Sequence, residues 1–144
     1  MSSRILIIDA NILIRGVLGS KVRDLIITNS DKVDFFTPEV CIQDAEKYLP
    51  ILFKKRSLSA EPALRLLSAL KSIIQVIDED VYSEYAEEAQ RRMENRDPQD
   101  WPIAAAALAL NSAIWTEDKD FFGSGFTTWM TAKVHIFFES GKSS

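Results

Sequence analysis

Three aspartates stand at positions where α/β proteins usually carry their chemistry. Asp9 directly follows the aliphatic residues 5–8, Asp118 follows a short apolar run, and Asp100 precedes a helical segment that contains Pro102. Ligands of open α/β sheets bind at the carboxyl ends of the strands, close to where the strand order reverses. We therefore expect Asp9, Asp100 and Asp118 to converge at one edge of a sheet, and Asp120 adds a second acid after the same strand.

Such a cluster of carboxylates implies a bound cation. Unpaired carboxylates within a few Å repel one another, so protons or cations must neutralise them. Mg²⁺ or Mn²⁺ suits this ligand set, because these hard ions prefer oxygen ligands and retain several waters. A site of this kind can lower the pKa of a water molecule for attack on phosphorus. The structural alternatives are turn positions for Asp9, Asp118 and Asp120, and a helix N-cap for Asp100.

No other group competes as a nucleophile or as a framework for structural zinc. Cys41 is the only cysteine and His135 is the only histidine. A single cysteine allows neither an internal disulfide nor a thiolate cluster within one chain. We expect Cys41 to be a buried apolar residue and His135 to occupy a structural position in a strand.

The elements that must position the aspartates follow from the apolar pattern. Strands are predicted at residues 4–8, 33–37, 75–77, 113–116 and 134–138. Helices are predicted at residues 10–18, 21–29, 38–52, 61–74, 82–95 and 103–110. Pro50 is expected to kink or interrupt the third of these helices, because proline removes a helical hydrogen bond. Strands alternating with helices predict an α/β fold with a mainly parallel sheet covered on both faces.

Size and charge narrow the class of protein. A chain of 144 residues, 47% of them hydrophobic, predicts a single domain over residues 1–144. Its apolar runs are shorter than the roughly 20 residues of a membrane span, and no signal segment is recognisable, so a cytoplasmic location without membrane contact is expected. The net charge of −4 argues against binding nucleic acid through bulk positive charge. The sequence also lacks GxGxxG and GxxxxGK[ST], which excludes the common nucleotide-binding loops.

Three short motifs in this order resemble the PIN-domain family. They are ILIIDAN ending at Asn11, DPQDWPIAAA beginning at Asp97, and IWTEDKDF ending at Phe121. The resemblance covers nearly the whole chain. It implies a three-layer α/β/α sandwich and an Mg²⁺- or Mn²⁺-dependent ribonuclease with an acidic quartet. Three places of that quartet are matched by Asp9, Asp100 and Asp118. Further residues are matched to supporting or additional positions: Asn11, Asp97, Thr116 and Asp120.

The resemblance places the fourth acid, normally Glu, on the helix after the second strand. The chain offers Asp44 and Glu46 there. The usual pattern of an acid before an apolar residue favours Asp44, which precedes Ala45, whereas the glutamate side chain favours Glu46. Residues two apart on a helix diverge by about 200°, so the two cannot serve equally. Both are retained, and Glu46 is preferred.

The resemblance also bears on partners. Many small stand-alone members are similar to the toxin halves of toxin–antitoxin pairs, which implies an RNA substrate, an antitoxin protein as partner and a homodimer. Apolar residues 136–138 and the helix at 61–74 are candidate dimer surfaces. Basic residues could flank the acidic groove and hold RNA phosphates: Lys54, Lys55, Arg56, Arg91, Arg92 and Arg96.

Two alternatives to a ribonuclease remain open. A catalytically degenerate PIN-like domain would only bind RNA or a protein. An aspartate after the first strand also resembles haloacid-dehalogenase-type phosphatases, in which that aspartate is the nucleophile. Asn11 stands where such phosphatases carry a second acid, which counts against this reading.

Overall fold

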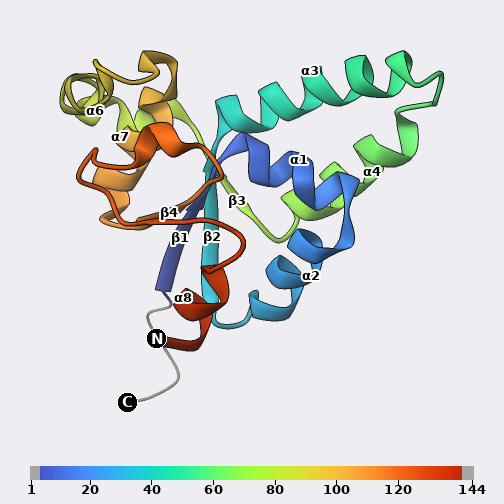
Figure 1. The fold of residues 1–144 in the computed structure, drawn as a ribbon, viewed down its shortest axis with the longest axis horizontal. Helices are drawn as coiled ribbons and strands as arrows, with labels where there is room; N and C mark the ends of the chain where they lie inside the picture. The colour runs from blue at the N-terminus through green and yellow to red at the C-terminus, as the bar shows by residue number, and fades with distance from the viewer. Residues whose placement is uncertain (1–3, 141–144) are drawn as a thin grey trace.

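Strand β1 (Arg4–Ile8) is the central strand of a parallel sheet (Figure 1). In the computed structural model, which describes residues 4–140, the strand order is β3-β2-β1-β4-β5 and every neighbouring pair is parallel. The other strands are β2 (Val33–Pro38), β3 (Gln75–Ile77), β4 (Ala113–Trp115) and β5 (Thr128–Trp129). Leu6, Ile7 and Ile8 are fully buried, as expected for a strand covered on both faces.

The connections place a switch in strand order between β1 and β4. Helices α1 (Ala10–Leu18) and α2 (Ser20–Asn29) lead from β1 to β2, and α3 (Glu39–Lys55) and α4 (Glu61–Lys71) lead on to β3. The chain then returns past β1 to β4. The return segments are α5 (Glu79–Tyr82), η1 (Ser83–Tyr85), α6 (Ala86–Met93), η2 (Pro98–Asp100) and α7 (Trp101–Leu110). Ligand sites of open α/β sheets lie at such a switch.

Helices cover both faces of the sheet, which confirms the predicted three-layer α/β/α fold class. Figure 1 shows α1 to α4 on one side of the strands and α6 and α7 on the other. The alanines at 104–107 of α7 are buried, and small side chains allow a helix to pack close to a sheet. Aromatic rings also pack in the core: the ring centroids of Phe35 and Trp115 lie 6.3 Å apart and those of Trp115 and Phe138 lie 5.9 Å apart.

The C-terminal segment differs from the prediction. Residues 134–138 belong to helix α8 (Val134–Ser140), so the predicted last strand is wrong. Val134, Phe137 and Phe138 are buried, and their spacing of three and four residues is helical. His135 is exposed on this helix, so its predicted place in a strand is wrong as well. The edge strand beside β4 is instead β5, a two-residue strand that the apolar pattern did not predict.

Two helices also differ in detail. Helix α3 includes Pro50 and runs on to Lys55, so the predicted interruption does not occur. The predicted helix at 82–95 is divided into α5, η1 and α6. In Figure 1, α3 and α4 extend away from the sheet as an arm. Within residues 4–140, no helix combines the length and the apolar character that crossing a membrane requires.

Candidate metal centre

Asp9 and Thr116 lie side by side where β1 and β4 end. The amide of Asp9 donates to the carbonyl of Trp115 at 3.2 Å, which continues the pairing of the two strands by one residue. The Asp9 side chain is buried at 7% exposure. Its Oδ1 accepts from the amide of Ala10 at 2.6 Å, and its Oδ2 accepts from Thr116 Oγ1 at 2.7 Å and from Asn11 Nδ2 at 3.0 Å. These bonds hold the carboxylate in one orientation.

Asn11 and Thr116 also hold the loop that follows β4. Asn11 Oδ1 accepts from the amide of Glu117 at 3.2 Å, and Thr116 Oγ1 accepts from the amide of Asp118 at 2.9 Å. Both side chains therefore bridge Asp9 to the segment that carries Asp118. The structure brings them together at the positions where the sequence predicted supporting residues.

Asp118 and Asp100 approach the same place from different elements. Asp118 precedes the short 3₁₀ helix η3 (Lys119–Phe121), and its Oδ1 accepts from the amide of Asp120 at 2.9 Å. Asp100 occupies the N-cap position of α7, as predicted, but its side chain makes no capping hydrogen bond. Its Oδ2 is buried and has no hydrogen-bond partner among the described residues. A buried oxygen of this kind usually has a partner, and a cation would supply one.

The electrostatics of the two carboxyls at the centre agree with this arrangement. Burial, a hydrogen bond with Asp118 and the charges of Asp9, Asp118 and Asp97 together raise the pKa of Asp100 to about 8. Burial also raises the pKa of Asp9 above 3.8, although its bonds with Thr116, Ala10 and Asn11 oppose the shift. Ionisation of either carboxyl is therefore unfavourable unless a positive charge lies nearby.

Three acids present oxygens to a common point. One carboxylate oxygen from each of Asp97, Asp100 and Asp120 lies within 4.8 Å of the other two. Asp97 and Asp120 are exposed, Asp100 is half-buried, and all three offer the hard oxygen donors that Mg²⁺ and Mn²⁺ prefer. Together with the unpartnered Oδ2 of Asp100, this donor set fits a divalent cation.

The two candidates for the fourth acid point in different directions. Glu46 faces α4, and its Oε2 lies 3.7 Å from Nζ of Lys71. Asp44 lies near Cys41: burial raises the pKa of the Cys41 thiol, and the charges of Asp9 and Asp44 both raise it further. Cys41 is buried, as the sequence analysis expected.

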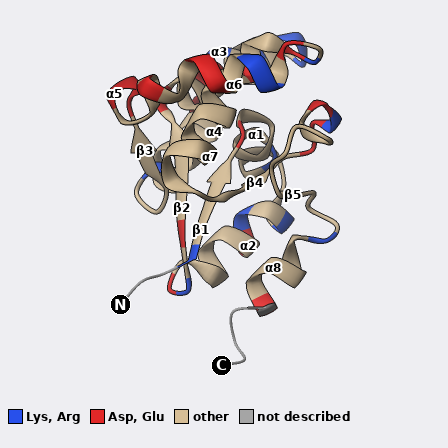
Figure 2. Cartoon of the chain, turned by 90° about the vertical axis from the view of Figure 1, so that its left-hand side faces the viewer, with Lys and Arg blue, Asp and Glu red and all other residues tan. Residues whose placement is uncertain are grey.

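The predicted basic residues are largely engaged within the chain. Arg91 and Arg92 form ion pairs with Glu88 of their own helix, and Arg96 Nε donates to the carbonyl of Phe122 at 3.2 Å. The basic residues at 54–56 are exposed at the end of α3, in the arm. Figure 2 shows acidic segments gathered over α5 and α6, towards the end of the molecule where β1 finishes.

Glu117 is a supporting residue that the sequence analysis did not single out. Its Oε2 accepts from the amide of Thr131 at 2.7 Å, and Thr131 Oγ1 accepts from Trp115 Nε1 at 3.1 Å. These bonds tie the loop bearing Asp118 to the segment before α8. The only signal in the sequence was its place inside the motif from Thr116 to Asp120, which does not distinguish a ligand from a brace.

Solved structures from other organisms have a similar fold. The VapBC2 complex of Rickettsia felis, bound to a DNA fragment from their promoter, matches with a TM-score of 0.67 at 16% identity over 88% of this chain and 98% of that one. DNA-bound VapBC of Salmonella typhimurium matches with a TM-score of 0.68 at 16% identity, over 90% of this chain and 99% of that one. PAE2754 of Pyrobaculum aerophilum matches with a TM-score of 0.69 at 15% identity, over 96% of this chain and 90% of that one. At these identities the likeness establishes the fold alone.

Sequence comparison adds the family. No curated protein matches the chain in sequence. The family model described as PIN domain matches residues 7–139, which include each of the acids discussed above. Because that match covers most of the chain, the protein belongs to the PIN domain family.

Proposed function

We propose that this protein is an Mg²⁺- or Mn²⁺-dependent endoribonuclease that hydrolyses phosphodiester bonds in RNA. The observation that carries the proposal is the meeting of Asp97, Asp100 and Asp120 oxygens within 4.8 Å, beside the buried, unpartnered Oδ2 of Asp100. This meeting point lies at the switch in strand order, next to Asp9 and Asp118. Membership of the PIN domain family supports the same assignment.

The proposed ligands are Asp9, Asp100, Asp118 and Asp120, with Asp97 as an additional ligand. A divalent cation bound there would neutralise the approaching phosphodiester and lower the pKa of the attacking water. Asn11 and Thr116 orient Asp9 through hydrogen bonds to its Oδ2. Removing a hydrogen bond that orients a metal ligand typically lowers metal affinity or activity by about 10–100-fold.

We assign the fourth place of the acidic quartet to Asp44, in preference to Glu46. Glu46 is directed to Lys71 on α4, whereas the charge of Asp44 acts on Cys41 together with that of Asp9. This proposal reverses the order of preference drawn from the sequence. The glutamate side chain argued for Glu46, but the helix turns that side chain towards α4.

An antitoxin-like protein is the partner that we propose, because two proteins of this fold are described in VapBC complexes bound to DNA. A small upstream gene for a DNA-binding protein would support this role, and its absence would count against it. The homodimer stays a prediction. Of its candidate surfaces, the segment 136–138 exposes Ile136 while Phe137 and Phe138 are buried within this chain, and α4 exposes Leu66.

Cleavage of single-stranded RNA tests the proposed activity. Wild type is compared with Asp9→Asn and Asp100→Asn, in Mg²⁺ or Mn²⁺ and again with a chelator. We expect chelator to abolish cleavage and each variant to reduce it by about 100-fold or more. Asp31→Asn, an exposed acid in the turn before β2, is the matched control and should cleave normally. If varied RNAs remain intact with either metal, the domain is a binding module instead.

A further inference from the structure

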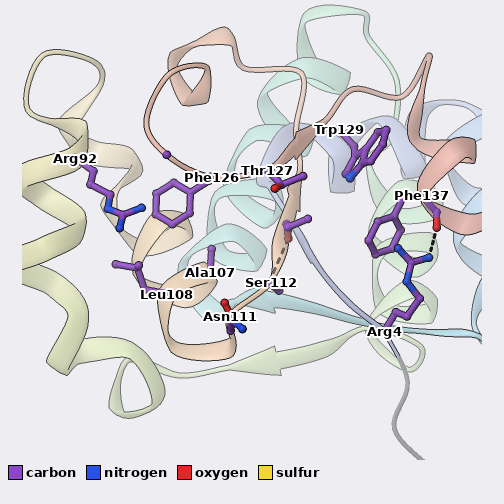
Figure 3. A pocket seen from close by; sticks show the side chains of 12 residues that line it. Arg4, Arg92, Ala107, Leu108, Asn111, Ser112, Phe126, Thr127, Trp129 and Phe137 are labelled. Carbon is purple, nitrogen blue, oxygen red and sulfur yellow. Dashed lines mark hydrogen bonds between the residues drawn. The ribbon is translucent and has the colours of Figure 1, made fainter. Parts of the chain in front are cut away.

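A cavity of about 490 Å³ lies beside β4 and β5 (Figure 3). Its walls come from α6, the end of α7, the start of β4, the segment that leads into β5, and α8. None of the acids of the candidate metal centre lines it, and among residues 4–140 no Asp or Glu belongs to its lining. The charged residues among the lining are Arg4 and Arg92, so the cavity differs in sign from the acidic cluster.

The two arginines are held by aromatic rings at opposite ends of the lining (Figure 3). Cζ of Arg92 lies 4.8 Å from the ring centroid of Phe126, and Cζ of Arg4 lies 3.7 Å from that of Phe137. Arg4 also donates to the carbonyl of Phe137. Nε of Arg92 bonds to Glu88 at 2.9 Å, which leaves its terminal amino groups for another acceptor. Arginine held on a ring in this way is pre-organised to bind phosphate.

Trp129 supplies a donor that lacks an acceptor. Its Nε1 is buried and has no hydrogen-bond partner among the described residues. A buried indole N–H usually finds a partner. Figure 3 shows the indole nitrogen on the ring edge that faces the rest of the lining, so an acceptor bound in the cavity could satisfy it.

Asn111 adds an amide at the same cavity. It ends α7 in the left-handed conformation, with φ of 50°, and its side chain lies among the lining residues in Figure 3. A side-chain amide offers both donors and an acceptor, which is the pattern that pairs with the edge of a base. Aromatic rings with interleaved arginine are the usual platform for a base and its phosphate.

We propose that this cavity binds one nucleotide unit, with its phosphate on Arg92 and its base among Phe126, Asn111 and Trp129. A free phosphate would leave the aromatic walls uncovered, and a nucleoside would offer no anion to the terminal amino groups of Arg92, whose Nε is paired with Glu88. The cavity lies within the range of about 300–1,000 Å³ that small-molecule sites occupy. The unit is either a free mononucleotide or part of an RNA strand, and the second source rests on the proposed ribonuclease function.

The indole N–H signals of the tryptophans provide a direct test by nuclear magnetic resonance. The chain has three tryptophans, at 101, 115 and 129. AMP, adenosine and inorganic phosphate are titrated in turn into the full chain with a chelator present. We expect AMP to shift the Trp129 signal while the signal of Trp101, which follows Asp100, stays in place. Adenosine and phosphate should bind at least about tenfold more weakly than AMP, because each lacks half of the contacts.

Single substitutions measure how much each contact contributes to AMP affinity. Arg92→Gln should weaken AMP binding by about tenfold or more, since it removes a charge-assisted bond. Arg91→Gln is the matched control, because Arg91 is exposed, precedes Arg92 on the same helix and bonds to the same Glu88, yet does not line the cavity. Trp129→Phe keeps a ring and removes the N–H, and its loss of AMP affinity is measured by calorimetry.

Several results would overturn the proposal. They are no shift of the Trp129 signal at about 10 mM AMP, phosphate binding as tightly as AMP, or unchanged AMP affinity in both Arg92→Gln and Trp129→Phe. The source is decided by RNA cleavage: a raised KM with unchanged kcat in Arg92→Gln assigns the unit to the substrate strand, and an unchanged KM assigns it to a free nucleotide. Because AMP binding is measured with chelator, failure of the proposed nuclease activity leaves this result standing.

Discussion

At the scale of single residues, the raised pKa of Asp100 predicts that its ionised form destabilises the fold when no cation is bound. The pKa of Asp100 is raised from 3.8 to about 8 by burial and neighbouring acids. The folded state therefore binds this proton more tightly than the unfolded chain does, and stability falls as the pH rises from 3.8 through about 8. Solvent screens a half-buried carboxyl, which reduces the expected cost to about 1–2 kcal/mol at high pH.

Asp100→Asn should consequently stabilise the metal-free protein. With chelator at pH 8, we expect the free energy of unfolding in urea to rise by about 1–2 kcal/mol, because the variant removes an unfavourable charge. The gain should be smaller at pH 5, where the folded state still holds the proton. Asp31→Asn should show no comparable gain. A loss of stability in Asp100→Asn at pH 8 would contradict the assigned electrostatics.

Asp44 and Glu46 give the second test at this scale. Asp44→Asn should weaken Mn²⁺ binding by about tenfold or more, since it removes the negative charge of the proposed fourth acid of the quartet. Glu46→Gln breaks the ion pair with Lys71, which is partly exposed and worth about 0–1 kcal/mol of stability, and should leave Mn²⁺ affinity unchanged. Calorimetric titration with Mn²⁺ measures both. The reverse order of effects would restore Glu46 as the fourth acid.

At the scale of elements, the sequence predicted the helices and strands whose buried residues follow a regular apolar pattern. The run before Asp9 is apolar throughout because both faces of β1 are covered, and Ile114 and Trp115 repeat this in β4. Strand β5 has two residues, too few for any period. In α8, the intervening Ile136 is apolar but exposed, so the short run resembled a strand.

The same reasoning explains what was predictable about the candidate site. Asp9, Asp100 and Asp118 were identified because each stands at the end of a predicted element. The close approach of Asp97 and Asp120 was not predictable, because both lie in loops, and no apolar period in the sequence determines the path of a loop. Arg96 links these loops: it precedes Asp97, and its Nε donates to the carbonyl of Phe122, just beyond Asp120.

Gly123 tests this link between loops. It has φ of +79°, and a Cβ there would lie 2.9 Å from Arg96 Nη2. Gly123→Ala should cost about 1–3 kcal/mol of stability through backbone strain, and it should weaken Mn²⁺ binding because Asp120 is displaced from Asp97. Gly19→Ala is the control, since Gly19 is extended and a Cβ would meet only Arg15 O at 3.8 Å.

A double-variant cycle distinguishes backbone strain at residue 123 from the contact between residue 123 and Arg96. If Gly123 and Arg96 are in contact, the effects of Gly123→Ala and Arg96→Ala on Mn²⁺ affinity should not add, with a coupling of about 0.5 kcal/mol or more. Fully additive effects would mean that the two residues act independently. Unfolding by urea and calorimetric titration of the same proteins give both readouts.

At the scale of the whole molecule, a chain of net charge −4 would meet RNA with an acidic surface. A divalent cation at the proposed site would neutralise part of the negative charge where β1 and β4 end. Cation binding should therefore couple both to RNA binding and to the stability of the fold. The second coupling is measurable without any knowledge of the RNA substrate.

Mn²⁺ at about one hundred times its dissociation constant should stabilise the fold by about 2.7 kcal/mol, which corresponds to a rise in Tm of roughly 6–10 °C for a chain of this size. The rise should be smaller at pH 6 than at pH 8.5, because a cation must displace the proton that Asp100 holds with a pKa of about 8. Scanning calorimetry of wild type and Asp9→Asn measures the effect. NaCl at matched ionic strength controls for screening of the acidic surface. An equal rise with NaCl, or an equal rise in Asp9→Asn, would mean that the cations act on the surface rather than at the acids between β1 and β4.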